Sequence, residues 1–231
     1  MIASFLRQVE EDFRSGIRGH ILTGNLWDYV LADGKRPARL GPFLGTWLEA
    51  QGYLVVLVSR SGGCQLADGG TDARRLQESA AWFQRQSGLG LRSGSAREDP
   101  LALAELREML IGLTRLLRQT ERRVALLVDY PQHFAPSTQG MAALASQEQQ
   151  LALEHLHRWG IDERVRATDN RVILLAPEGL VHELLTEAGG GYRVVRVGLP
   201  SYEERLDFLR LLLGLSERGR SEFAVLESEL S

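Results

Sequence analysis

The stretch VALLVDYP at residues 124–131 decides the fold of this chain. Its first five residues are apolar without polar alternation, which is typical of a strand buried on both faces in a parallel sheet. Similar runs occupy residues 53–58 (YLVVLV) and 171–176 (RVILLA), one on either side of it along the chain. Because such strands must be covered on both faces, these runs predict a parallel sheet between layers of helices.

Strand-like and helical segments alternate along the rest of the chain. Two shorter strands are expected at residues 20–23 and 193–197. The expected helices cover residues 4–14, 42–51, 72–86, 100–120, 147–159, 179–186 and 202–213. Turns or loops are expected at residues 32–37, 87–99 and 135–145, the last of which also fits a weak helix. The pattern predicts an α/β fold, a three-layer α/β/α sandwich with a mainly parallel five-stranded sheet and right-handed crossovers.

Composition and charge exclude several classes of protein. The 231 residues are 44% hydrophobic and 25% charged, which is ordinary for a globular chain with one core. A formal net charge of -3 gives no basic surplus, so we expect no nucleic-acid partner. The apolar runs are too short to span a bilayer, and the N-terminus lacks the features of a signal peptide. With a single cysteine, Cys64, we expect a cytoplasmic protein without an internal disulfide.

Asp129, which closes the buried run at 124–128, is a candidate magnesium ligand. A carboxylate in this position has the form of a Walker B site, where it helps to hold Mg²⁺ near nucleotide phosphates, here through water. An ordinary strand end remains the other interpretation. The next residue is Tyr130, and a phenol is a poor general base at neutral pH.

A Walker A phosphate loop, G-x-x-x-x-G-K-[ST], is missing from the sequence. Of the 27 basic residues only Lys35 is a lysine, and the motif around it would need glycine at Tyr29 and a hydroxyl at Arg36. The end of the first expected strand offers Gly24 and Asn25 as candidate cofactor contacts. A tight turn with one of these two residues at positive φ is the alternative interpretation.

Three further groups of residues carry side chains of types that can bind a ligand or a partner. The five histidines and the cysteine have no metal-ligand spacing, so we expect no metal site built on them. The loop at residues 59–63 fits either a turn or an anion contact through Arg60. Trp27, beside Asp28 and Tyr29, would form a contact patch if it were exposed.

Three segments resemble AAA+ ATPases: VALLVDY (124–130), DNRVILLAP (169–177) and, above all, RVVRVGLPSYEERLDFLRLLL (193–213). In that family the fifth strand leads into a turn of the form lP-x-x-x-x-R, and here Pro200 and Arg205 have this spacing. The resemblance covers residues 1–213 as one domain and implies the sheet order 5-1-4-3-2, counted along the chain. Residues 214–231 would be a tail or the start of the family's helical lid. The resemblance implies ATP with Mg²⁺ as the cofactor, although the residues themselves lead us to expect no cofactor. It also makes Arg193 a candidate for the arginine that contacts nucleotide.

The chain departs from the family's pattern in two ways: it has no Walker A loop, and Tyr130 follows Asp129. These departures decide which function we expect. They indicate a degenerate AAA+-like domain of the kind found N-terminal to an active AAA+ module, and we expect the chain to be part of a longer ATPase. Such a domain would be a non-hydrolysing scaffold, regulatory or oligomerisation module of a protein-remodelling ATPase. Its partners would be an AAA+ ATPase domain or other copies in a ring. Two alternatives remain open: a Mg-nucleotide-binding ATPase with an atypical phosphate loop, and an unrelated doubly wound binding domain.

Overall fold

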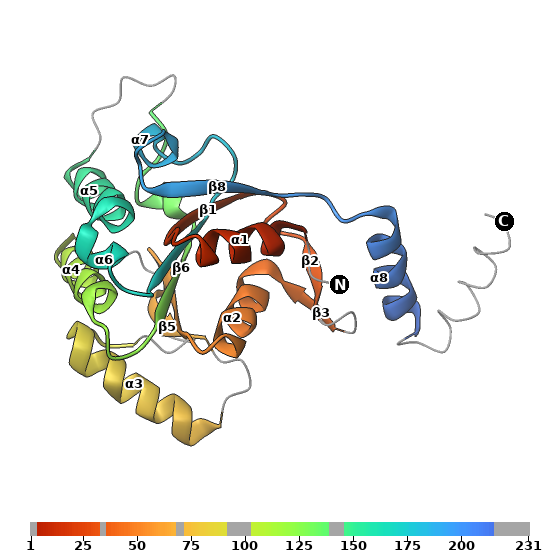
Figure 1. Ribbon diagram of the computed structural model, residues 1–231, viewed down its shortest axis with the longest axis horizontal. Coiled ribbons are helices and arrows are strands. Elements are labelled where there is room, and N and C mark those ends of the chain that lie inside the picture. The colour runs from red at the N-terminus through yellow and green to blue at the C-terminus, as the bar shows by residue number, and fades with distance from the viewer. Residues whose placement is uncertain (1–3, 33–35, 68–71, 92–102, 139–145, 215–231) are drawn as a thin grey trace, which may run out of the picture.

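A computed structural model describes residues 4–32, 36–67, 72–91, 103–138 and 146–214 of the chain (Figure 1). Its centre is a six-stranded sheet in the order β5-β4-β6-β7-β1-β8. The strands of this sheet are β1 (Gly19–Gly24), β4 (Leu54–Ser59), β5 (Gly63–Leu66), β6 (Val124–Asp129), β7 (Arg171–Leu175) and β8 (Tyr192–Val197). All neighbouring pairs are parallel except β4 and β5.

The expected five-stranded sheet is therefore corrected in strand count, and its order is extended by one strand. The five expected strands keep the order 5-1-4-3-2, as β8-β1-β7-β6-β4, and the added strand continues the sheet beyond β4. The sixth strand, β5, pairs antiparallel with β4 at one edge, where the sequence indicated a turn after residue 58. A second correction concerns residues 32–37, expected to be a turn. Strands β2 (Tyr29–Ala32) and β3 (Arg36–Arg39) pair there as a separate two-stranded sheet. All three added strands belong to short hairpins whose glycines and turn residues dominate the local sequence.

Helices cover both faces of the sheet and complete three layers (Figure 1). The longer ones are α1 (Ser4–Arg14), α2 (Leu40–Ala50), α3 (Ala73–Ser87), α4 (Leu103–Arg118), α5 (Gln147–Ile161) and α8 (Tyr202–Gly214). The shorter ones are η1 (Pro131–His133), α6 (Glu163–Arg166) and α7 (Glu183–Thr186). Alternate residues of β6 enter separate cores, since Leu126 packs with α4 and α5 and Leu127 packs with α1 and α2.

Local hydrogen bonds explain where several helices begin. The side chains of Ser146 and Gln149 form a capping box at the start of α5, and Ser201 and Glu204 bond in the same way before α8. Helix α7 begins at Glu183 instead of residue 179, because Val181 forms an antiparallel bridge with Pro136. The expected start of the helix at 100–120 lies outside the described residues, as do residues 92–99 and 139–145 of two expected loops.

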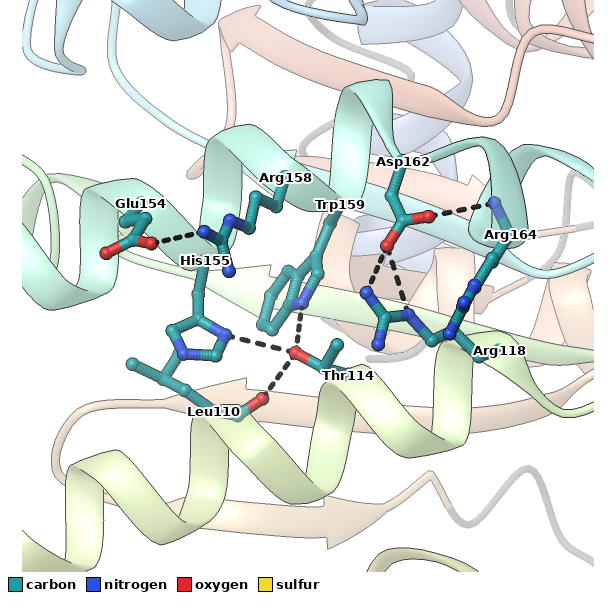
Figure 2. Close-up of polar contacts among 9 residues, drawn as sticks. All are labelled: Leu110, Thr114, Arg118, Glu154, His155, Arg158, Trp159, Asp162 and Arg164. Atoms are coloured by element: carbon teal, nitrogen blue, oxygen red, sulfur yellow. Dashed lines mark hydrogen bonds and ion pairs between the residues drawn. The ribbon is translucent and has the colours of Figure 1, made fainter.

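A polar contact joins α4 to α5 on one face of the sheet (Figure 2). The Thr114 hydroxyl donates to the Leu110 carbonyl at 2.7 Å and accepts from Trp159 Nε1 at 2.8 Å. His155 Nδ1 lies 3.0 Å from the same oxygen, so this nitrogen carries the proton and donates. Burial lowers the pKa of His155 and favours this neutral state. At the end of α5, Arg118 bonds Asp162, which also accepts from the Arg164 amide at 2.8 Å.

The end of α5 also packs against the loop before β8 through backbone alone. We call this contact the glycine seam; it consists of Gly160, Gly190 and Gly191. A Cβ on Gly160 would lie 2.5 Å from the Gly190 carbonyl oxygen, and a Cβ on Gly191 would lie 2.2 Å from the Gly160 backbone. Beyond the seam, the buried Tyr192 hydroxyl donates to the Leu156 carbonyl at 2.6 Å. Packing therefore requires two glycines of the triple glycine, Gly190 and Gly191.

No helix in the described part of the chain is both long and apolar enough to cross a membrane.

Candidate functional site

The carboxyl ends of β1, β7 and β6 lie next to one another at one edge of the sheet. Leu22 of β1 pairs with Leu175 of β7, and Leu175 pairs with Asp129 of β6. Asp129 therefore lies two strand spacings from β1, roughly 10 Å. Ligands of open α/β sheets bind at this edge, so the candidate site belongs here.

The turn after β1 uses its own backbone amides. Gly24 has φ of +91°, and a Cβ there would lie 2.6 Å from the Val197 carbonyl oxygen. The Asn25 amide donates to that oxygen at 3.0 Å, and the Leu26 amide donates to the Gly24 carbonyl at 3.0 Å. The Asn25 side chain donates to Asp28 Oδ2 at 2.8 Å. The turn interpretation of Gly24 is thus confirmed, and both amides next to it are engaged.

The hairpin β2–β3 follows this turn, and α2 begins only at Leu40. A phosphate loop places a helix N-terminus directly after the strand, so that free amides and the helix dipole face the anion. Here a strand occupies that place in the chain. In the part of the chain that the structure describes, the segment after β1 thus differs from a strand that leads directly into a helix.

Asp129 is half-buried at the end of β6. Its Oδ1 accepts from the Tyr130 amide at 3.1 Å, and burial raises the pKa of its carboxyl group. Tyr130 itself has φ of 53°, in the left-handed region. For a bulky residue this conformation is strained, and such strain gathers at functional positions.

Three aromatic rings stack beside Asp129. Trp27 and Tyr130 lie 4.8 Å apart between ring centroids, and Tyr130 and His133 lie 5.2 Å apart. We call Trp27, Tyr130 and His133 the aromatic stack. Because β7 lies between β1 and β6, this stack spans the carboxyl end of β7. Trp27 is 50% exposed and Tyr130 36%, so the stack faces solvent.

Arg60, in the turn between β4 and β5, approaches the same region. It donates to the His133 carbonyl at 2.9 Å and forms an ion pair with Glu148 of α5. Its charge is therefore matched by a carboxylate within the molecule. The loop at residues 59–63 is the turn of the β4–β5 hairpin.

Arg193 lies at the other end of the sheet. It is the second residue of β8, and it forms an ion pair of 3.5 Å with Asp12 of α1. Asp12 also lies 3.3 Å from Nε2 of the buried His20. The structure therefore brings together Asp129, Gly24 and Asn25 at one edge and places Arg193 away from them.

A cavity of about 220 Å³ opens beside β1, β7 and β8. Glu178 and Glu183 line it, and the described lining residues include no arginine or lysine. Hydrogen bonds from Ser137 and, more weakly, from Thr138 lower the pKa of Glu183 to about 2. Arg196 pairs with Glu178 at 3.6 Å, so Glu183 is the carboxylate that makes this cavity unfavourable for phosphate.

The described side chains include no group of three or more His, Cys, Asp or Glu that could hold a metal ion. Asp129 would have to bind Mg²⁺ with water as the main source of ligands. Sequence reasoning noted Trp27 and Tyr130 separately and missed His133 as their neighbour. The only local signal was an aromatic residue followed by proline directly after a buried strand.

Comparisons with solved structures and with family models each found a match. A structure of a HORMA:CdnC:Trip13 complex from E. coli MS115-1 contains a similar chain, with a TM-score of 0.37 and 16% identity. The likeness covers 72% of this chain and 56% of that one. None of the curated proteins compared matches the sequence. The model of the family "AAA+ chaperone, N-terminal Rossmann-like domain" matches residues 1–187, more than half of the chain. The chain therefore belongs to the family of N-terminal Rossmann-like domains of AAA+ chaperones.

Proposed function

We propose that this domain is a non-hydrolysing module of an AAA+ protein-remodelling chaperone and that it acts through protein contacts. Its partners would be an AAA+ ATPase domain or further copies in a ring. One observation carries the proposal: the first two backbone amides after β1 are engaged by carbonyls of the chain. The Asn25 and Leu26 amides both donate to carbonyls of the chain itself, so neither is free for phosphate.

The charges around the same edge support this proposal. Asp28 follows the turn, Asp129 ends β6, and Glu178 and Glu183 line the adjacent cavity. Triphosphate is strongly anionic and needs cationic groups and free donors around it. Arg60, the basic side chain bonded to the stack through His133, is already paired with Glu148.

Exposed apolar residues support the protein-contact part of the proposal. Leu199, on the segment that connects β8 to α8, is 78% exposed, and Tyr202, the first residue of α8, is 64% exposed. Trp27 adds a half-exposed aromatic ring at the carboxyl edge of the sheet. Large exposed apolar side chains of this kind are enriched at protein interfaces.

Calorimetric titration of Mg-ATP, and then Mg-ADP, into the 231-residue chain tests the proposal. We expect no saturable heat up to about 5 mM nucleotide, a range that would detect even millimolar affinity. A phosphate-release assay on the same sample should give no turnover.

The variant Asp129→Ala decides what any binding would mean, with Asp207→Ala on α8 as a matched control. Saturable heat that is lost in Asp129→Ala and kept in Asp207→Ala would contradict the proposal. That result would favour the alternative, a Mg-nucleotide-binding ATPase whose phosphate contacts differ from the Walker A loop.

A further inference from the structure

The aromatic stack is a built surface that faces solvent. Tyr130 covers one face of the Trp27 ring, yet Trp27 remains 50% exposed. Tyr130 holds this position from a strained left-handed backbone. The His133 ring stacks on Tyr130 with an interplanar angle of 10°. A strained residue that holds two rings at the surface is typical of a binding position, because packing alone would not require it.

The groups around the stack carry a negative surplus. Asp28 is adjacent to Trp27 and exposed, and within the described residues only its Oδ2 is engaged, by Asn25. Asp129 places a second carboxyl group next to Tyr130. The guanidinium of Arg60 is matched by Glu148 and does not offset these two groups. An aromatic surface with this charge attracts a cation and repels a phosphate-bearing base.

The chain contains a tryptophan ring that an arginine already covers, at Trp82. The guanidinium of Arg122 lies over the Trp82 ring, 5.7 Å from its centroid. Glu121 accepts from Trp82 Nε1 at 3.3 Å, so a carboxylate also lies at the edge of this ring. Among the described side chains, no arginine lies over Trp27. Trp27 and Asp28 thus offer the ring and the carboxylate without the guanidinium.

We propose that Trp27 and Asp28, supported by Tyr130 and His133, dock an arginine side chain presented by a protein partner. This inference rests on the proposed function, since it names the chemistry by which the module contacts a protein. The guanidinium stacks on the open face of Trp27 and pairs with Asp28. A single contact of this kind is weak, so the partner's affinity would come from several such contacts together.

Titration of an arginine tripeptide, acetyl-Gly-Arg-Gly-amide, into the ¹⁵N-labelled 231-residue chain tests this proposal. The reporter is the indole N–H signal of Trp27, assigned by its loss in Trp27→Phe. We expect this signal to shift progressively with peptide up to about 20 mM, as suits a weak cation–π contact. The Trp82 signal should stay in place, because Arg122 already covers that ring.

Three controls make the result specific. The matching citrulline peptide, which has the same shape without the charge, should shift the Trp27 signal several-fold less. Asp28→Asn keeps an acceptor for the Asn25 side chain and should weaken the binding of the arginine peptide by about threefold. Asp207→Asn on α8 should leave the titration unchanged. A stationary Trp27 signal, an equal effect of citrulline, or an unaffected Asp28→Asn would each overturn the inference.

Adenosine monophosphate and Mg-ATP, titrated in the same way, separate this inference from the proposed function. If the Trp27 signal moves with the nucleotides and not with the arginine peptide, the inference fails, and the proposed function fails with it if Asp129→Ala abolishes the shift caused by Mg-ATP. If neither ligand moves it, the arginine site fails while the non-hydrolysing function stands.

Discussion

At the scale of single residues, Gly24 shows how backbone geometry closes the end of β1. Its φ of +91° and the 2.6 Å approach of a Cβ to the Val197 oxygen require glycine. Gly16 has a similar φ of +85° with nothing within 4 Å of its Cβ position. We expect Gly16→Ala to lower the free energy of unfolding by about 1 kcal/mol through φ alone. Gly24→Ala should cost roughly 1–3 kcal/mol more, because the clash with backbone is added.

Urea denaturation of the two glycine variants measures this difference. Equal losses in Gly24→Ala and Gly16→Ala would mean that the turn after β1 can relax. In that case the contact with Val197 would not hold the turn closed.

His20 gives the fold a dependence on pH. Its side chain is buried, its Nε2 lies 3.3 Å from Asp12, and Arg171 and Arg193 lie near it. Burial lowers the pKa of His20 to about 4, although Asp12 acts in the opposite direction. Because the unfolded chain takes up this proton at higher pH, acidification from pH 6.5 to pH 4 removes stability. The loss from His20 should be on the order of 3 kcal/mol.

Thermal or urea unfolding at pH values between 4 and 7 checks this prediction. His20→Gln removes the titrating group and should flatten the profile, whatever it does to stability at pH 7. His155, whose pKa is also lowered by burial, remains in that variant and leaves part of the slope. A slope that His20→Gln does not change would show that His20 is not responsible.

At the scale of helices and strands, Thr114 joins α4 to α5 as Figure 2 shows. Thr114→Val keeps the shape of the side chain and leaves the buried Trp159 N–H without its acceptor. We expect a loss of about 1–3 kcal/mol in the free energy of unfolding. Thr46→Val is the matched control, because the exposed Thr46 hydroxyl only donates to a carbonyl one turn back. Equal effects of the two changes would contradict this role.

The sequence predicted the long elements better than the short ones, for physical reasons. The run at residues 124–128 is buried on both faces, and its continuous hydrophobicity marks a strand wherever it occurs. Strand β5 covers only Gly63–Leu66. Its extended conformation depends on pairing with β4, and the local sequence pattern does not encode that pairing. The same holds for β3, whose neighbouring residues resemble a turn. Edge strands and hairpins depend on distant partners, and their sequences carry little periodicity.

At the scale of the whole molecule, α8 stands apart from the three-layer body (Figure 1). Tyr202 is 64% exposed and Leu209 is 49% exposed, and Phe208 stacks on Tyr29 of β2 at 6.1 Å. We expect α8 to open easily, so its amides should exchange with deuterium orders of magnitude faster than those of β6. Exchange measured by mass spectrometry on peptides from both segments checks this. Slow exchange of α8 at low protein concentration would contradict it.

The candidate site depends on contacts between distant segments, which limits its prediction from sequence. The acidic end of β6 and the glycine turn after β1 were evident, because each follows a recognisable strand. The meeting of Trp27 with Tyr130 and His133 was not, since it requires β7 between them and a left-handed Tyr130. Arg193 was expected near nucleotide, and the structure places it beside Asp12 at the opposite end of its strand.

The glycine seam between α5 and the loop before β8 has a consequence for tracing the ancestry of this domain. Two backbones touch there, so a side chain at Gly160 or at Gly191 would push the segments apart. The two positions are expected to be kept together or lost together during divergence, since either change alone removes the contact. Paired glycines at these positions would therefore mark descendants that inherit this packing, and would separate them from proteins that share only the sheet.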